Sequence, residues 1–558
     1  MAIGRFARTI WELDPRQVVG RVGFRARRAL WPLVRSTPSW PSQIPALPSR
    51  DALPSSCPFD DEDLHAIERG SLRLAGHEAR LPDDAPFEPD APDPLYRYQL
   101  HEHAWLREAM TRSSAARPSL HAWLLRYARM AAPRGSVAID PYPLATRLLQ
   151  WQGLVQLGLL DAGAMRAPIV EATRLLVGLS ETHLLANHLL RDRAALVVGS
   201  AWIAGAMGEA VRARAARAFA SECDAQFDPE GMHEERCPAY HAHASMDLLF
   251  ALDAIAAGPL GDPAIGRARE VIARHAENAV AALEVVTHAD DHVAAFGDSA
   301  PRSAPRTSEI AAWARSMGLL ASRVVEHAAG AMRRRTLPRS GFSRVTGERM
   351  DVLLTHGPFG APSQPGHAHC DLFAFELDVD GRRVIVDPGV HAYHDPTWRS
   401  HTRTSASHAT PTVEGREQAE IWSRFRCGWR PRSIEARWTD DRVICEARAF
   451  GPHHATTLRR ALQITPESLR LEDAIDDASE MSSALPLAPD LDAELEGARA
   501  VRVTRHGESV LSVQLLSEGR ITIERAEVSH RFGARVPALR LRLHGPGRVE
   551  YTLVLAPP

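Results

Sequence analysis

The densest group of chemically active side chains lies in the second half of the chain, where histidines crowd around the motif Gly-His-Ala-His-Cys-Asp at 366–371. On a strand, His367 and His369 point to the same face, so two imidazoles could converge on one metal ion. Asp387 and His408 follow further along. Together with His369 they form a predicted ligand set of two nitrogens and one oxygen. Such a set suits one divalent ion, zinc or manganese, and leaves a position open for water.

Two metal-hydrolase patterns share part of this motif, and neither fits. The binuclear pattern HxHxDH requires a histidine where this chain has Leu372. Amidohydrolase barrels carry their HxH near the start of a (β/α)8 chain, whereas the residues after His369 are too few and too rich in β patterns to build one. Two alternatives stay open: a mononuclear hydrolase that uses the predicted ligand set, and a chance cluster of surface histidines on a hairpin.

The first half of the chain carries polar groups of its own. Asn187 and His188 interrupt an apolar helical segment, where buried polar groups need partners or a purpose. A mutually satisfied interior pair is the alternative interpretation. The stretch 228–241 is dense in titratable side chains and precedes a predicted helix, and loops carry chemistry more often than cores do. A third segment, Phe-Gly-Asp-Ser at 296–299, is expected to line the same cleft.

The chain contains no lysine, and all 66 basic side chains are arginine. This excludes a phosphate-binding P-loop, a pyridoxal or aldolase-type Schiff base and a protein-kinase site, because each of them requires a lysine. Codon bias explains the absence, since the chain is also very rich in alanine. Cationic contacts to any anionic ligand must therefore come from arginine or histidine.

Composition and charge are those of an ordinary globular protein. The net charge of -3 argues against a dedicated nucleic-acid-binding protein. The six cysteines include no CxxC pair, so reduced thiols are expected. The arginine-rich N-terminus lacks the apolar core of a secretory signal, and no apolar run is long enough to span a membrane. We therefore expect a cytoplasmic protein, with a periplasmic or secreted one as the alternative.

The hydrophobic pattern divides the chain into three parts. Residues 1–94 combine a basic amphipathic arm, which either packs on the body or lies on a membrane surface, with proline-rich connectors at 36–62 and 82–94. Residues 95–325 have the helical period and predict hairpins stacked as a solenoid, bundle or toroid. Residues 326–558 alternate with a period of two and predict an antiparallel β domain. The function should lie where the two domains meet.

Some individual elements are predicted more sharply than the rest. A hairpin is expected to pair 373–379 with 384–386 through the turn Asp380-Gly381, since this dipeptide favours tight hairpin turns. The clearest predicted helices are 95–112, 119–131, 142–159, 167–179, 184–207 and 241–257. The clearest later strands are 442–447, 468–471, 520–523, 539–543 and 549–555.

Four separated motifs together resemble the heparinase II/III-like polysaccharide lyases. They are Asn187-His188, EGMHEERCPAYH at 230–241, HAHCDLFAFELDVDGRRVIVDPGVHAY at 367–393 and RTSASHATPTVEGREQAEIW at 403–422. Cys237 and Ala409 depart from the Ser and Asn that are common in the family. The resemblance implies a multidomain α+β fold, in which an N-terminal incomplete (α/α) toroid precedes a C-terminal antiparallel β-sheet domain resembling a β-sandwich.

Members of that family cleave uronic-acid polysaccharides by β-elimination and leave an unsaturated sugar, and the resemblance implies the same reaction here. Asn187 and His367 match the residues that neutralise the substrate carboxylate. Tyr240 matches the tyrosine that donates a proton to the leaving oxygen. His188 matches the histidine that takes the C5 proton, although Tyr240 does both for some stereochemistries. Tyr393 matches a further tyrosine of the family's site.

The resemblance also gives roles to the surrounding residues. Glu235 is expected to support or orient its neighbours, and the metal ion is expected to be structural, anchoring the loop that carries His367. Arg399 and Arg403 are expected to bind a carboxylate or sulfate, with ordinary surface ion pairs as the alternative. The implied partner is an anionic uronic-acid polysaccharide: a glycosaminoglycan (hyaluronan, chondroitin sulfate, heparan sulfate), with alginate or a bacterial exopolysaccharide as the alternative. A non-catalytic polysaccharide-binding or assembly protein is the alternative of a different class.

Overall fold

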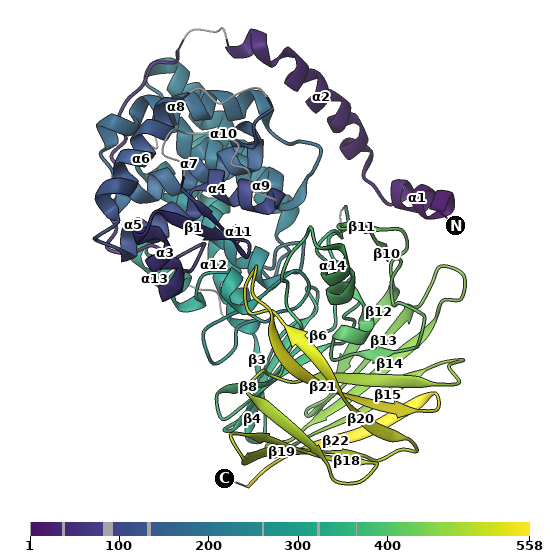
Figure 1. The fold of residues 1–558 in the computed structure, drawn as a ribbon. Helices are drawn as coiled ribbons and strands as arrows, with labels where there is room; N and C mark the ends of the chain where they lie inside the picture. The colour runs from purple at the N-terminus through teal and green to yellow at the C-terminus, as the bar shows by residue number, and fades with distance from the viewer. Residues whose placement is uncertain are drawn as a thin grey trace.

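The computed structural model describes residues 2–35, 39–81, 93–130, 135–258, 262–320, 324–363 and 365–557. Figure 1 shows a helical domain followed by a β domain, with two N-terminal helices lying outside both. This confirms the predicted fold class, a multidomain chain in which stacked helices precede antiparallel sheets.

The helical domain packs its helices around one large apolar core. Its main helices are α4 (Pro94–Glu102), α5 (Ala104–Arg112), α6 (Arg117–Arg129), α7 (Pro141–Gln156), α8 (Ala162–Leu179), α9 (Ala186–Ser200), α10 (Gly205–Gln226), α11 (Pro238–Ala256), α12 (Pro263–Val285) and α13 (Thr307–Ser316), with 3-10 turns at Val137–Ile139 and Pro301–Ser303. The helix predicted over 95–112 is in fact two helices, because His103 adopts a left-handed backbone conformation (φ 60°) between them. The predicted helix over 184–207 likewise ends at Ser200.

The segment that leads into the helical domain is more ordered than predicted. It contains α3 (Asp61–Glu68) and a small hairpin of β1 (Ser71–Leu74) and β2 (His77–Arg80). The helix begins there because the Asp60 and Asp63 side chains cap each other's backbone N–H groups. The predicted connector at 82–94 lies almost wholly outside the described residues.

The β domain contains three main sheets, and every strand pair in them is antiparallel. One sheet has the order β3 (Glu326–Ala329), β4 (Met332–Leu337), β5 (Phe342–Thr346), β6 (Met350–Thr355), β7 (Phe375–Val379) and β8 (Arg382–Ile385). The largest has the order β12 (Arg432–Trp438), β13 (Arg442–Ala449), β14 (Thr456–Ile464), β15 (Ser468–Ile475), β22 (Arg548–Leu555), β19 (Glu508–Leu515), β18 (Ala500–Arg505) and β17 (Leu491–Leu495). The third has the order β20 (Arg520–Val528), β21 (Val536–Gly545), β16 (Met481–Pro486) and β9 (Pro411–Thr412).

Smaller elements of the β domain lie on the side of the helical domain. They are α14 (Pro396–Arg403), a 3-10 turn at Ser405–Ser407 and a short hairpin of β10 (Ile421–Trp422) and β11 (Arg426–Cys427). The hairpin predicted around Asp380-Gly381 is confirmed: β7 pairs with β8, and both turn residues have positive φ. This hairpin places Asp387 just beyond the end of β8.

The N-terminal arm consists of α1 (Ala2–Trp11) and α2 (Pro15–Arg35), which arch from the helical domain to the β domain (Figure 1). Arg8 forks onto Glu420 near β10 with N–O distances of 2.8 and 2.5 Å. Arg28 pairs with Asp140 of the helical domain at 2.9 Å. These ion pairs tie the arm to both domains, while apolar side chains such as Trp11 and Val19 are exposed. Whether the arm packs on the body or lies on a membrane surface stays a prediction. In the described part of the chain, no helix has both the length and the apolarity needed to cross a bilayer.

A buried ionic cluster joins the two domains. His288, which follows α12, lies between the carboxylates of Asp378 and Glu376 on β7, and its Nδ1 is 2.8 Å from Asp378 Oδ1. Burial and Arg383 lower the pKa of His288, but the two carboxylates outweigh them and raise it to about 9. The imidazolium therefore stabilises the domain interface.

This cluster predicts a pH-dependent stability. Because the pKa of His288 is higher in the folded than in the unfolded chain, its contribution is complete below about pH 6.5 and is lost as the pH rises through about 9. A shift of this size corresponds to about 3 kcal/mol of unfolding free energy. We expect His288→Gln to abolish this part of the fall in unfolding free energy with rising pH. Urea unfolding at a series of pH values measures it. His356→Gln should retain it, because burial lowers the pKa of His356 to about 4 and keeps it neutral throughout.

Candidate functional site

The site is assembled where a loop of the helical domain enters the β domain. The backbone N–H of Asp298 donates to the carbonyl of His367 at 3.0 Å. Gly297 makes this approach possible: its φ is +59°, and a Cβ there would lie 2.8 Å from the same carbonyl oxygen. The 296–299 segment thus lines the junction, as the sequence predicts.

Asp298 is the centre of the site, a role that the prediction for segment 296–299 did not include. Its carboxylate is fully buried and accepts hydrogen bonds from Nδ1 of His367 and Nε2 of His369, each at 2.7 Å. The Arg399 guanidinium forks onto the same carboxylate, with Nη2 at 2.8 Å from Oδ2. Burial alone would raise the pKa of Asp298, but Arg399 and the two imidazoles hold it well below its usual range. A permanent negative charge is therefore fixed behind both histidines.

The expectation that Arg399 and Arg403 contact substrate does not fit their positions. Both lie on α14 with only 2% of their surface exposed. Arg399 is occupied by Asp298, and Arg403 donates to the backbone carbonyls of Ala368, Ser423 and Arg424. Their guanidinium groups hold the site together from within, because a buried arginine must satisfy its donors inside the protein.

Three aromatic side chains face one another across the domain junction. Tyr240, in the first turn of α11, hydrogen-bonds Tyr393 through the two hydroxyl oxygens at 2.8 Å. The His367 ring lies on the Tyr240 ring, with centroids 4.1 Å apart. Tyr393 is buried, whereas Tyr240 and His367 remain partly exposed. The predicted residues Tyr240, His367 and Tyr393 are therefore brought together, and two of the three are partly exposed.

Burial raises the pKa of both tyrosines well above the ordinary value, and the nearby Asp298 charge adds to the effect. Tyr240 is consequently a phenol rather than a phenolate near neutral pH. A protonated tyrosine suits a proton donor; the arrangement does not favour Tyr240 as the resting base.

Glu235 connects this aromatic cluster with α9. One of its oxygens accepts from the backbone N–H of Asn187 at 3.3 Å, and the other is buried without a hydrogen-bond partner among the described residues. Burial raises the pKa of Glu235, while His367 and His188 lower it, so these groups lie within electrostatic reach of one another. The predicted supporting role of Glu235 is compatible with this position.

Asn187 and His188 do not form the mutually satisfied pair that was the alternative interpretation. Nδ1 of His188 is 2.8 Å from a carboxylate oxygen of Glu181, and its ring lies against Tyr142 at 4.5 Å. Burial lowers the pKa of His188, but Glu181 outweighs it and raises the pKa above the usual value. With Nδ1 held, Nε2 is the nitrogen available to another group.

The backbone before Asn187 is strained. Leu185 and Ala186 both have positive φ, 57° and 46°, which residues other than glycine rarely adopt. The strain fixes where α9 begins and hence where Asn187 and His188 project. No sequence signal predicts it, since neither residue is a usual left-handed one, and such strain clusters at functional sites.

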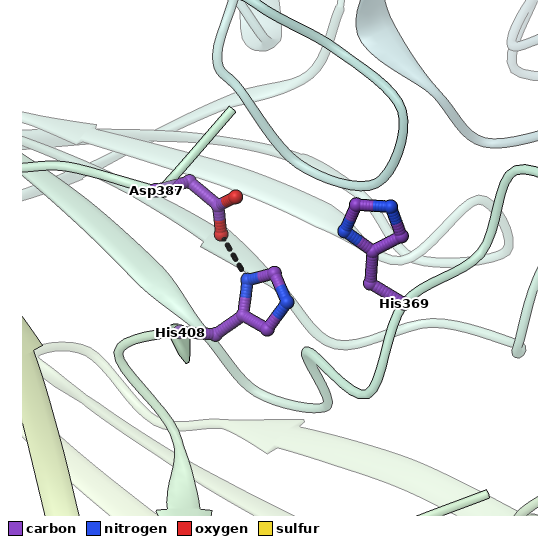
Figure 2. A group of neighbouring side chains, drawn as sticks. All are labelled: His369, Asp387 and His408. Atoms are coloured by element: carbon purple, nitrogen blue, oxygen red, sulfur yellow. Dashed lines mark hydrogen bonds and ion pairs between the residues drawn. The ribbon is translucent and has the colours of Figure 1, made fainter. Parts of the chain in front are cut away.

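The predicted metal ligands also converge. One ligand atom from each of His369, Asp387 and His408 lies within 4.8 Å of the others, and all three residues are buried (Figure 2). The interpretation as a chance cluster of surface histidines is therefore wrong. One prediction needs correction: His367 and His369 lie on a loop rather than a strand, and the group they share is Asp298, not the metal site.

The chemistry of this set fits a divalent ion. His369 Nδ1, Asp387 Oδ1 and His408 Nε2 are each buried without a hydrogen-bond partner among the described residues. Burial lowers the pKa of both histidines, to about 3 for His369, so their rings are neutral, which is the form that binds metal. Two imidazoles and a carboxylate suit zinc.

Removing one ligand should remove the ion. We expect His408→Ala to lower the bound-metal content from about one ion per chain to near zero and to lower the melting temperature, because structural metal ions stabilise the folded chain. The matched control is His356→Ala, which removes another buried histidine but one that hydrogen-bonds Ser343 instead. Elemental analysis of the two purified variants measures the difference, and an unchanged metal content in His408→Ala contradicts the ligand assignment.

Comparison with known proteins agrees with this architecture. The family model described as "Heparinase II/III-like, C-terminal" matches residues 330–554. Among solved structures, a heparinase III shares 13% identity with a TM-score of 0.65, covering 98% of this chain and 93% of its own. The heparan sulfate lyase HepC from Pedobacter heparinus shares 15% identity with a TM-score of 0.54, covering 96% and 88%.

A third structure, a chondroitin AC lyase from Streptomyces coelicolor A3 in complex with chondroitin sulphate, shares 11% identity with a TM-score of 0.52 and covers 96% of this chain and 83% of its own. None of the curated proteins matches the sequence. The family model thus matches the β domain, and nearly the whole chain shares the fold of these three solved structures.

Proposed function

We propose that the protein is a polysaccharide lyase that cleaves uronic-acid polysaccharides by β-elimination, with glycosaminoglycans as the favoured substrates. The observation that carries the proposal is the contact of Tyr240 with Tyr393 and His367, backed by the buried carboxylate of Asp298. The fold shared with heparan sulfate and chondroitin lyases supports the same class of reaction.

The reaction removes a weakly acidic proton beside a carboxylate, so the negative charge must be neutralised first. Asn187 and His367 would supply hydrogen bonds to the carboxylate. His188, whose pKa Glu181 raises, would take the C5 proton through Nε2. The electrons of the broken C5–H bond form the C4–C5 double bond as the C4–O bond breaks, and the leaving oxygen takes the proton of Tyr240.

The supporting groups act through these residues. Asp298 would orient His367 by accepting from Nδ1, so Nε2 would be the nitrogen available to the substrate. Tyr393 would hold the Tyr240 hydroxyl in place. A divalent ion held by His369, Asp387 and His408 would anchor three segments of the β domain and supply positive charge near the site.

Ultraviolet absorbance of the unsaturated product tests the proposal. We expect the protein to produce it from at least one polymer in a panel of hyaluronan, chondroitin sulfates, heparan sulfate, heparin and alginate. Activity on alginate alone would favour the alternative substrate. New reducing ends without absorbance, abolished by a chelator, would instead indicate a metal hydrolase. Binding without either product would indicate a non-catalytic polysaccharide-binding protein.

A further inference from the structure

A cavity lies at the junction of the domains, on segments adjoining the candidate site. It has a volume of about 720 Å³ and lies between 290–306 of the helical domain and parts of the β domain. Its size is within the range of small-ligand pockets, about 300–1,000 Å³, and exceeds what one inorganic anion would fill. Its wall is unusually cationic, with the arginines Arg302, Arg306, Arg382, Arg383 and Arg505.

The carboxylates of the wall neutralise only part of this charge. Asp290 accepts from Arg383 at 2.9 and 3.1 Å. Asp490 is shared between Arg382 and Arg505, each at 2.9 Å. The remaining acid, Asp387, turns its carboxylate toward His408. Three of the arginines are therefore ion-paired with two acids of the wall itself.

Arg302 and Arg306 are the exception. Both are exposed, and neither has a carboxylate within ion-pair distance in the described part of the chain. Among the described residues, the Arg306 guanidinium donates to the backbone carbonyl of Asp290 at 3.3 Å. The positive charge of Arg302 acts on the two histidines of the wall. Burial lowers the pKa of His292 and of His530, and Arg302 lowers both further. The cavity therefore presents two arginines that no ion pair of its wall engages.

The segments that build this wall also build the candidate site. The segment that carries Arg302 begins at Asp298, which holds His367. The segment that carries His530 continues to Phe532, whose ring packs on Tyr393 at 5.1 Å. The two segments are joined where the Arg302 N–H donates to the His530 carbonyl at 2.8 Å. A ligand in the cavity would therefore contact both supports of the catalytic cluster.

We propose that this cavity is a second binding site for an anionic saccharide, whose carboxylate or sulfate groups are held by Arg302 and Arg306. Guanidinium groups suit these anions because they present paired N–H donors in a plane. The site is separate from the catalytic cluster, since none of Tyr240, His367 and His188 lines it. Only the choice of a saccharide as the ligand rests on the proposed function.

Calorimetric titration tests the proposal on the full chain carrying Tyr240→Phe, so that the probe is not consumed. The probe is a chondroitin sulfate tetrasaccharide, and neutral chitotetraose is the comparison. We expect Arg302→Ser/Arg306→Ser to lose one tetrasaccharide site or to weaken it by about tenfold or more. The affinity of that site should also fall with added salt. The control is Arg267→Ser/Arg269→Ser, which removes two exposed arginines from α12.

The second site would be overturned if the titration were unchanged by Arg302→Ser/Arg306→Ser, if the α12 control lost as much binding, or if the neutral probe bound equally well. Absence of any tetrasaccharide binding would overturn it as well. None of these outcomes depends on turnover. Failure of the lyase proposal would appear separately, as absence of ultraviolet absorbance when the unaltered protein meets the polymer panel.

Discussion

Replacing Tyr240 by Phe is expected to lower turnover by about 100- to 10,000-fold while the protein stays folded. The change removes one oxygen atom, and with it the hydrogen bond to Tyr393 and the proton for the leaving oxygen. The aromatic contact with His367 is retained, so the carboxylate-binding side of the site should be preserved. We therefore expect kcat to fall far more than KM changes.

Two companion variants sharpen this result. Tyr393→Phe removes the hydroxyl that positions Tyr240, and a smaller loss of kcat is expected because the proton donor remains. Tyr96→Phe removes a buried hydroxyl that bonds the Leu72 carbonyl rather than a residue of the site, and it should leave activity unchanged. Near-normal kcat in Tyr240→Phe would show that another group protonates the leaving oxygen.

Replacing Asp298 by Ala is expected to be the most damaging single change in both stability and activity. It leaves the Arg399 guanidinium buried and unpaired, which costs about 3–5 kcal/mol of unfolding free energy. It also frees the rings of His367 and His369, and a misplacement of about 1 Å at a reacting centre costs roughly 100-fold in rate. Urea unfolding and kcat measure the two effects.

A double variant separates the two roles of Asp298. Asp298→Ala/Arg399→Met removes the unpaired charge, so it should recover part of the lost stability while activity stays low. Strictly additive stability losses would show that the ion pair does not hold the site. Asp473→Ala is the matched control, because Asp473 is equally buried and forks with Arg460 at 2.6 and 2.7 Å. It should lose stability while its folded fraction keeps full activity.

The order of the domains could be predicted because local sequence patterns carry it. The three- and four-residue spacing of apolar side chains reflects helices that bury one face, and the two-residue alternation reflects half-buried strands. The Asp380-Gly381 turn was predictable for a local reason too, since it requires positive φ at both residues. The domain boundaries drawn at 95 and 326 stay predictions.

Helix breaks were less predictable than helices. His103 separates α4 from α5 by adopting positive φ, and Leu185 and Ala186 do so before α9. None of these residue types marks a break in the sequence, because the surrounding packing imposes the conformation. The same packing places Asn187 and His188 at the start of a helix rather than within one.

The chemical types present were fixed by the sequence alone. A chain without lysine leaves tyrosine, histidine and arginine for proton transfer and for anion contacts. The motifs around Tyr240, His367 and His408 identified the residues that lie at the domain junction and in the candidate metal site. Residue types and short spacings are local properties, so they can be read without a structure.

Only the tertiary structure decided what each of these residues faces. Asp298 meets His367, His369 and Arg399 from 69, 71 and 101 positions away in the chain. Contacts so distant in sequence leave no periodic pattern, and a carboxylate on a loop looks the same whether it is solvated or buried. For the same reason the sequence allowed Arg399 to be predicted as a substrate contact. The structure shows that Arg399 is buried and that Asp298 already neutralises its charge.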